Sequence, residues 1–242
     1  PLWVYLLASL IGGFVWTFLF VAQSYYVKYA FGVENFGTQT ALLGLLSIGS
    51  FIIGTIVSQW VLKVKGITPA QGFIFAYGLS VLPLVVLWLL NLSGPIRSII
   101  IFYPLMFLAM LGIGMGFVPG NLIRMETMDY NKDKVGKGMQ GTLTSLTAFS
   151  EKVQAAIASA VTGLVLAAVG YNAELYQDAT TIPAELFQGL GLVMFGVPAL
   201  LGIITIAVMA FYPLLKADER AAMYAEIEAR KLQAESIQLQ TQ

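Results

Sequence analysis

Histidine and cysteine are both absent from this chain of 242 residues. Without cysteine there is no disulfide, no thiol nucleophile and no thiolate ligand for a metal. Without histidine the chain lacks the commonest metal ligand and the usual general base of enzymes. Because the sequence also offers no buried pair of aspartates, it predicts a protein that is not an enzyme and has no metal site.

Charge is scarce as well. Only 11% of the residues are charged and 58% are hydrophobic, whereas roughly a quarter are charged in soluble globular domains. The formal net charge is zero, so nothing favours a nucleic-acid partner. This composition predicts an all-α membrane protein whose first partner is lipid.

Long charge-free runs mark the predicted membrane spans. No charged residue occurs between Lys65 and Arg97, between Arg97 and Arg124, or between Glu185 and Lys216. Each run exceeds the ~20 residues that a helix needs to cross ~30 Å of hydrocarbon, where backbone groups must be bonded within their own segment. The sequence therefore predicts six transmembrane helices, at about 2–31, 38–63, 70–92, 97–124, 138–169 and 185–213.

The joints between these spans contain turn residues, including Gly32, Gly66, Gly94 and Gly170. Lysine and arginine gather on one side of the predicted membrane: Lys63, Lys65, Arg124, Lys132, Lys134, Lys137, Lys216 and Arg220. The opposite side has only Lys28 and Arg97. The positive-inside rule then predicts a multi-pass protein of a bacterial plasma membrane with both termini in the cytoplasm. Residues 1–216 form the predicted six-helix bundle, and 217–242 a cytoplasmic helical tail.

The fifth predicted helix places charge at mid-membrane, because Glu151 and Lys152 lie near its midpoint. A charged side chain there costs several kcal/mol unless it faces a protein interior or a water-filled cavity. Helical spacing aligns Lys152 with Ser145, Ala148, Ala155, Ser159 and Gly163 on one stripe. The small residues Ala155, Ser159, Gly163 and Ala167 predict close approach of another helix. Pairing of the two charges purely to hold the bundle together is the alternative.

Several short segments carry a resemblance to a known family. They are Met125 to Tyr130, Gly141, Ser145 to Lys152, Gly170-Tyr171, Tyr25 to Tyr29 and Phe211 to Leu214. Together they resemble the glycoside–pentoside–hexuronide:cation symporters, the melibiose permease family. In that family an acidic Asp-Tyr loop precedes a glycine and a helix with a single mid-membrane lysine. Asp129 and Tyr130 match the cytoplasmic loop motif, and Lys152 matches the lysine.

The resemblance implies the major facilitator fold, with this chain as the C-terminal six-helix half. The first residue is Pro1 and not methionine, which also suggests a piece of a longer polypeptide. The N-terminal six-helix bundle of the same polypeptide would then be a partner, and a sugar cavity would lie between the two bundles. The family's coupling cation, Na⁺ or H⁺, binds mainly in that other half, and no further cofactor is implied.

The resemblance thus implies secondary active transport of a sugar or glycoside by alternating access. The first, second, fourth and fifth helices would line the cavity. Lys152 would contact the substrate or the coupling acids, Glu151 is a second candidate, and Gln23, Tyr26 and Thr147 are candidates for hydrogen bonds to the sugar. The family's Gln-Thr pair facing the sugar is replaced here by Thr147 and Ala148, so the sugar class stays open. A non-transporting or homo-oligomeric six-helix membrane protein is the rival hypothesis.

Overall fold

The computed structural model describes residues 1–64, 66–135, 140–172 and 183–240, and every element within these ranges is helical. Six of the helical segments are long and apolar enough to cross a membrane, which confirms the predicted all-α membrane fold. The elements are α1 (Leu2–Phe31), η1 (Val33–Asn35), α2 (Phe36–Val61), α3 (Pro69–Asn91), α4 (Ile99–Val135), α5 (Gln140–Ala168), α7 (Ala184–Gly191), η2 (Leu192–Gly196), α8 (Val197–Met209) and α9 (Ala217–Gln240).

Glycine turns separate the spans where the sequence predicts them. Backbone φ is 87° at Gly32, 88° at Gly66, 134° at Gly94 and 75° at Gly170, conformations that glycine adopts without a steric penalty. A reciprocal pair of hydrogen bonds between Thr68 and Gln71 begins α3, which satisfies two of the amides left free at a helix start.

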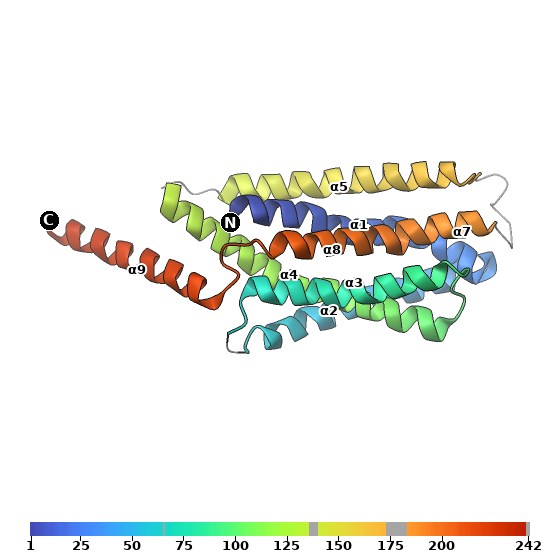
Figure 1. Ribbon diagram of the computed structural model, residues 1–242, viewed down its shortest axis with the longest axis horizontal. Coiled ribbons are helices and arrows are strands. Elements are labelled where there is room, and N and C mark those ends of the chain that lie inside the picture. Colours follow the sequence, from blue (N-terminus) through green and yellow to red (C-terminus); the bar gives the residue numbers. More distant parts are fainter. Residues whose placement is uncertain (65, 136–139, 173–182, 241–242) are drawn as a thin grey trace.

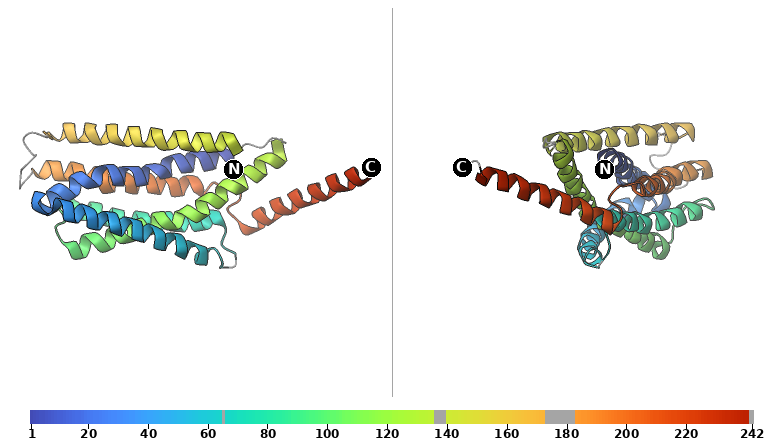
Figure 2. Two further views of the ribbon diagram at one scale, coloured as in Figure 1. Left: turned by 180° about the vertical axis from the view of Figure 1, so that it is seen from behind. Right: turned by 60° about the vertical axis from the view of Figure 1, so that its left-hand side comes forward.

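The bundle is organised around α1 and α4. Helix α1 packs against α8 and α5, whereas α4 lies between α2 and α3. Helix α5 is at an edge of the bundle and packs mainly on α1, as the views in Figures 1 and 2 agree. The N-terminus and the start of α9 lie at one end of the bundle, which we call the tail end (Figure 1).

Two glycines of α4 let its backbone come close to the backbones of α2 and α3. A Cβ added at Gly114 would lie 2.4 Å from the carbonyl oxygen of Phe51 on α2, and one at Gly112 would lie 2.5 Å from the amide of Ser80 on α3. The glycine-rich stretch of α4 thus serves close helix packing. The helix itself continues through Pro119 as one element.

One predicted boundary is wrong. Helix α4 extends to Val135 and not to residue 124, so Asp129 and Tyr130 lie within a helix and not in a loop. The charged residues after Arg124 end the apolar run, but no proline or glycine ends the helix there. The last span runs over Ala184–Met209, close to the predicted 185–213, and it contains the π-helical turn η2 between α7 and α8. The predicted helix start at 138 and much of the joint after Gly170 lie outside the described residues.

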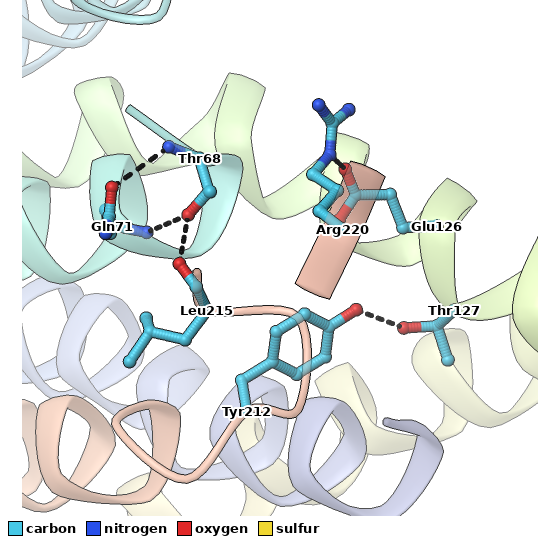
Figure 3. Close-up of polar contacts among 7 residues, drawn as sticks. All are labelled: Thr68, Gln71, Glu126, Thr127, Tyr212, Leu215 and Arg220. Carbon is cyan, nitrogen blue, oxygen red and sulfur yellow. Dashed lines mark hydrogen bonds and ion pairs between the residues drawn. The ribbon is translucent and has the colours of Figure 1, made fainter. Parts of the chain in front are cut away.

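Helix α9 projects from the tail end and is fixed to the bundle at its first turns (Figures 1 and 3). Three interactions make this junction: the ion pair of Arg220 with Glu126, a 3.2 Å hydrogen bond between the hydroxyls of Tyr212 and Thr127, and a 2.8 Å bond from the Thr68 hydroxyl to the Leu215 carbonyl. Met223 is buried in the apolar cluster beneath the junction. Burial, reinforced by the Glu126 carboxylate, raises the pKa of Tyr224.

Candidate binding cavity

Two adjoining cavities lie where α5 diverges from α4. Helix α5 packs on α1 but not closely on α4, and residues of α1, α4 and α5 line both spaces. Side chains of α3, and Phe51 of α2, complete their walls. The volumes are about 720 and 420 Å³, within the range of small-molecule sites.

Glu151 lines both cavities, at the middle of α5. Gln154, one turn along the same helix, is almost fully buried and lines the larger cavity. Its amide nitrogen donates to the backbone carbonyls of Leu10 (2.8 Å) and Ser9 (3.3 Å) on α1. The absence of a side chain at Gly13 makes room for this amide, because a Cβ there would lie 2.3 Å from the Gln154 nitrogen. The bonds hold α5 against α1 and leave the amide oxygen of Gln154 as an acceptor beside the cavity.

The smaller cavity extends toward the tail end. Arg124 of α4 lines it and donates a 2.7 Å hydrogen bond to the Thr144 hydroxyl on α5. Thr147 lines the same cavity, and its hydroxyl donates to the backbone of its own helix. The Arg124–Thr144 bond bridges the gap between α4 and α5, and so narrows the space at this end.

Lys152 lies on a different face of α5. Its side chain is exposed, and it is not among the residues that line the two cavities. The whole predicted stripe is exposed in this chain: Ser145, Ala148, Lys152, Ala155, Ser159 and Gly163. One of its members, Ala155, also lines the larger cavity. The face of α5 that packs on the bundle is instead made of Leu143, Gln154, Ala158, Thr162 and Leu166. The small-residue series is therefore not the contact between α5 and the described helices of this chain.

Tyr26 is buried in the core, with no exposed surface. Its hydroxyl donates to the side-chain oxygen of Asn91 (2.8 Å) and accepts from the backbone amide of Ile96 (3.1 Å). Asn91 in turn donates to the Phe187 carbonyl (3.0 Å). In this arrangement the Tyr26 hydroxyl joins α1 to α3, Asn91 extends the link to α7, and Tyr26 does not line the cavities.

Gln23 is half-buried on α1 and does not line either cavity. Its side-chain oxygen is buried, and no hydrogen-bond partner is found for it within the described part of the chain. The predicted contact of Gln23 with a sugar stays a prediction.

The sequence analysis missed Gln154 and the aromatic residues of the larger cavity: Trp16, Phe20, Phe51 and Phe117. An amide at mid-membrane one turn from Glu151 was a usable signal, because a buried polar group in lipid needs a partner. The aromatic residues gave no such signal, since 12% of the chain is aromatic and most of these side chains serve packing.

A family model described as MFS/sugar transport protein matches residues 1–216. The chain belongs to this family. The predicted resemblance to sugar symporters of the major facilitator fold is thus confirmed, and so is the multi-pass membrane character.

The curated relatives that this chain matches are named as transporters. The chain is 27% identical to a putative sulfoquinovose importer of Escherichia coli over 96% of its own length and 46% of the importer's. It is 26% identical to the putative glycoside/cation symporter YagG of the same organism, over 89% of this chain and 44% of the symporter. An isoprimeverose transporter of Lactiplantibacillus pentosus is 33% identical over 52% of this chain and 25% of the transporter. The chain spans about half the length of the first and second of these relatives. Membership of a transporter family agrees with the prediction that the protein is not an enzyme.

Proposed function

We propose that this chain is the C-terminal half of a carrier that moves a sugar or glycoside across the membrane by alternating access. The observation that carries the proposal is the cavity between α4 and α5, within the membrane-spanning bundle. Its wall has a mid-membrane carboxylate, Glu151, and the amide of Gln154. A carboxylate at that depth costs several kcal/mol, which is typical of residues on a substrate or ion path. The relatives described above are named for transport of sulfoquinovose, isoprimeverose or glycosides, which supports a sugar substrate.

The exposed stripe of α5 supports the second part of the proposal, an N-terminal bundle that packs on this face. Lys152 lies on the stripe, and an exposed ammonium group at the middle of a span would otherwise face lipid. In the proposed whole carrier, Lys152 contacts the substrate or the coupling acids of the other half. Glu151, Gln154 and Thr147 would bind the sugar from this half.

Coupling to Na⁺ or H⁺ is part of the proposal and rests on the family resemblance and on the name of one relative. Among the described residues no group of three or more His, Cys, Asp or Glu side chains could hold a metal ion. We assign the main cation site to the other half, as the family resemblance implies. The basic residues of the tail end, such as Lys63, Lys216 and Arg220, support a cytoplasmic location for this end and for both termini.

The test is uptake of labelled sugars by the full-length carrier in cells or vesicles, with and without a sodium or proton gradient. Replacement of Lys152 by alanine is expected to abolish accumulation while insertion into the membrane stays normal. Lys28→Ala is the matched control, because this lysine lies in the last turn of α1 beside the Tyr29 ring and not on the exposed stripe of α5. Near-normal accumulation by the Lys152→Ala variant would contradict the assignment.

The exposed stripe of α5 also fits the rival hypothesis, a non-transporting or homo-oligomeric six-helix protein in which this face joins two copies. The mass of the native polypeptide, extracted from its own membrane, separates the two. A chain about twice as long supports the carrier, since the curated relatives are about twice the length of this chain. A native chain of 242 residues without uptake activity supports the oligomer.

A further inference from the structure

The joint between α3 and α4 contains a third cavity, at the end of the bundle opposite the tail end (Figure 1). Its volume is about 630 Å³, and it shares no lining residue with the two cavities described above. Helices α3 and α4 are both long and apolar enough to cross the membrane. The joint between Asn91 and Ile99 therefore lies at the membrane surface, at the level of the lipid headgroups.

Arg97 gives this cavity its charge. The residue is exposed and lines the cavity, and no Asp or Glu occurs between Glu34 and Glu126 in the sequence. Within the described part of the chain, Arg97 forms no ion pair with a carboxylate. A guanidinium presents its donors in a planar fork that matches two oxygens of a phosphate. Ser98, the next residue, adds a hydroxyl donor to the same lining.

The opposite wall of the cavity is apolar. Leu90 at the end of α3 and Ile101 in the first turn of α4 line it, and they are 39% and 43% exposed. Outside the cavity the surface stays apolar, because Ile99 and Ile100 of α4 are 52% and 85% exposed. An apolar wall that continues along a membrane-spanning helix favours a ligand with acyl chains over a soluble anion.

We propose that this cavity binds a phospholipid with a negatively charged headgroup, with its phosphate on Arg97 and Ser98 and an acyl chain against Leu90 and Ile101. The site lies apart from the cavities among α1, α4 and α5, so the inference does not depend on the proposed transport function.

The lining favours phosphatidylglycerol over phosphatidylethanolamine. The Ser93 hydroxyl donates to the Leu90 carbonyl (2.7 Å), so its oxygen remains an acceptor for the terminal glycerol of phosphatidylglycerol. The ammonium group of phosphatidylethanolamine would find no carboxylate among the described lining residues, and Arg97 would repel it. The expected preference is about fivefold, the factor that two like charges about 4 Å apart in water produce.

The experiment is native mass spectrometry of the full-length protein in detergent, titrated with the two lipids carrying identical acyl chains. Arg97→Ala is expected to weaken binding of phosphatidylglycerol about tenfold, because a charge-assisted contact is lost, and to remove the preference. Lys28→Ala is the matched control, since this cation lies in the last turn of α1 and does not line the cavity. Its dissociation constants should equal those of the unmodified protein.

Two further measurements test the acyl part of the site. Ile101→Ala is expected to weaken binding of both lipids about threefold and to keep the preference, whereas Ile100→Ala, outside the lining, should change neither. Glycerophosphoglycerol, which is the headgroup without acyl chains, and inorganic phosphate are added as competitors. At least about 100-fold more of either than of phosphatidylglycerol should be needed for displacement.

Thermal unfolding of each variant shows whether it is folded, and Arg97→Gln replaces Arg97→Ala if the latter is not. Equal binding of the two lipids overturns the proposal, as does a preference that survives the loss of the Arg97 charge. An equal loss in Lys28→Ala would also overturn it, because attraction to positive charge in general would then explain the binding. Displacement by inorganic phosphate at concentrations similar to those of the lipid would show that the ligand is a soluble anion and not a lipid.

Discussion

Removal of the Arg220 guanidinium is predicted to release helix α9 from the bundle. Arg220 pairs with Glu126, whose side chain is only 3% exposed, while that of Arg220 is 38% exposed (Figure 3). Loss of one partner of a buried pair costs ~3–5 kcal/mol, since the other charge stays in a dry site. Here the cost is smaller, because separation of α9 from α4 lets water reach the Glu126 carboxylate. We expect a loss of about 2 kcal/mol in the free energy of α9 docking for Arg220→Ala.

Substitution of the partner, Glu126, is predicted to reduce the free energy of α9 docking by less. Glu126→Ala leaves a guanidinium that already reaches water, so the expected loss is below about 1 kcal/mol. The double variant should resemble Glu126→Ala alone, because it contains no buried unpaired carboxylate. The sum of the two single losses in docking free energy would then exceed the loss in the double variant by roughly 2 kcal/mol, which indicates that the two residues are energetically coupled.

Hydrogen exchange of backbone amides in α9 measures this docking in the full-length protein. Exchange in the first turns of α9 should become about 30-fold faster in Arg220→Ala, while exchange within α1 and α4 stays unchanged. Arg230→Ala is the control, because the ion pair of Arg230 with Glu226 is about half exposed on both sides. Equal effects of Arg220→Ala and Glu126→Ala, or no acceleration in either, would refute the reasoning.

Three further predictions concern thermal unfolding of the full-length protein and sugar uptake, its proposed function. Tyr26→Phe leaves Asn91 and a backbone amide without their partner and should lower the free energy of unfolding by about 2 kcal/mol, with the KM for sugar uptake unchanged. A raised KM would show instead that the Tyr26 hydroxyl contributes to sugar binding. Gly114→Ala forces α4 from α2 and should cost about 1–3 kcal/mol, whereas Gly49→Ala, in open space, should change little. Gln154→Leu removes the bonds to α1 and should cost about 1–2 kcal/mol and slow uptake; wild-type values for both would show that these bonds do not matter.

The agreement on the spans and the error on α4 have one physical origin. Apolar residues partition into lipid one segment at a time, so the charge-free runs located the six spans. A charge ends an apolar run but does not end a helix, which is why α4 continues past Arg124 to Val135. The turn η2 could not be predicted, since a π-helical insertion depends on the contacts of the last span with its neighbours.

The sequence by itself determined the class of protein, the number of spans and the family, because these depend on composition, on run length and on short motifs. It also identified α5 as the helix with mid-membrane charge. Only the tertiary structure decided which face of α5 meets the bundle: Gln154 and Ala158 pack on it, whereas Glu151 and Lys152 are both exposed and only the first of these two lines the cavity. Adjacent residues of a helix point about 100° apart, and periodicity cannot say which direction a neighbouring helix occupies. That choice depends on contacts between segments distant in the chain, such as the bonds from Gln154 to Ser9 and Leu10.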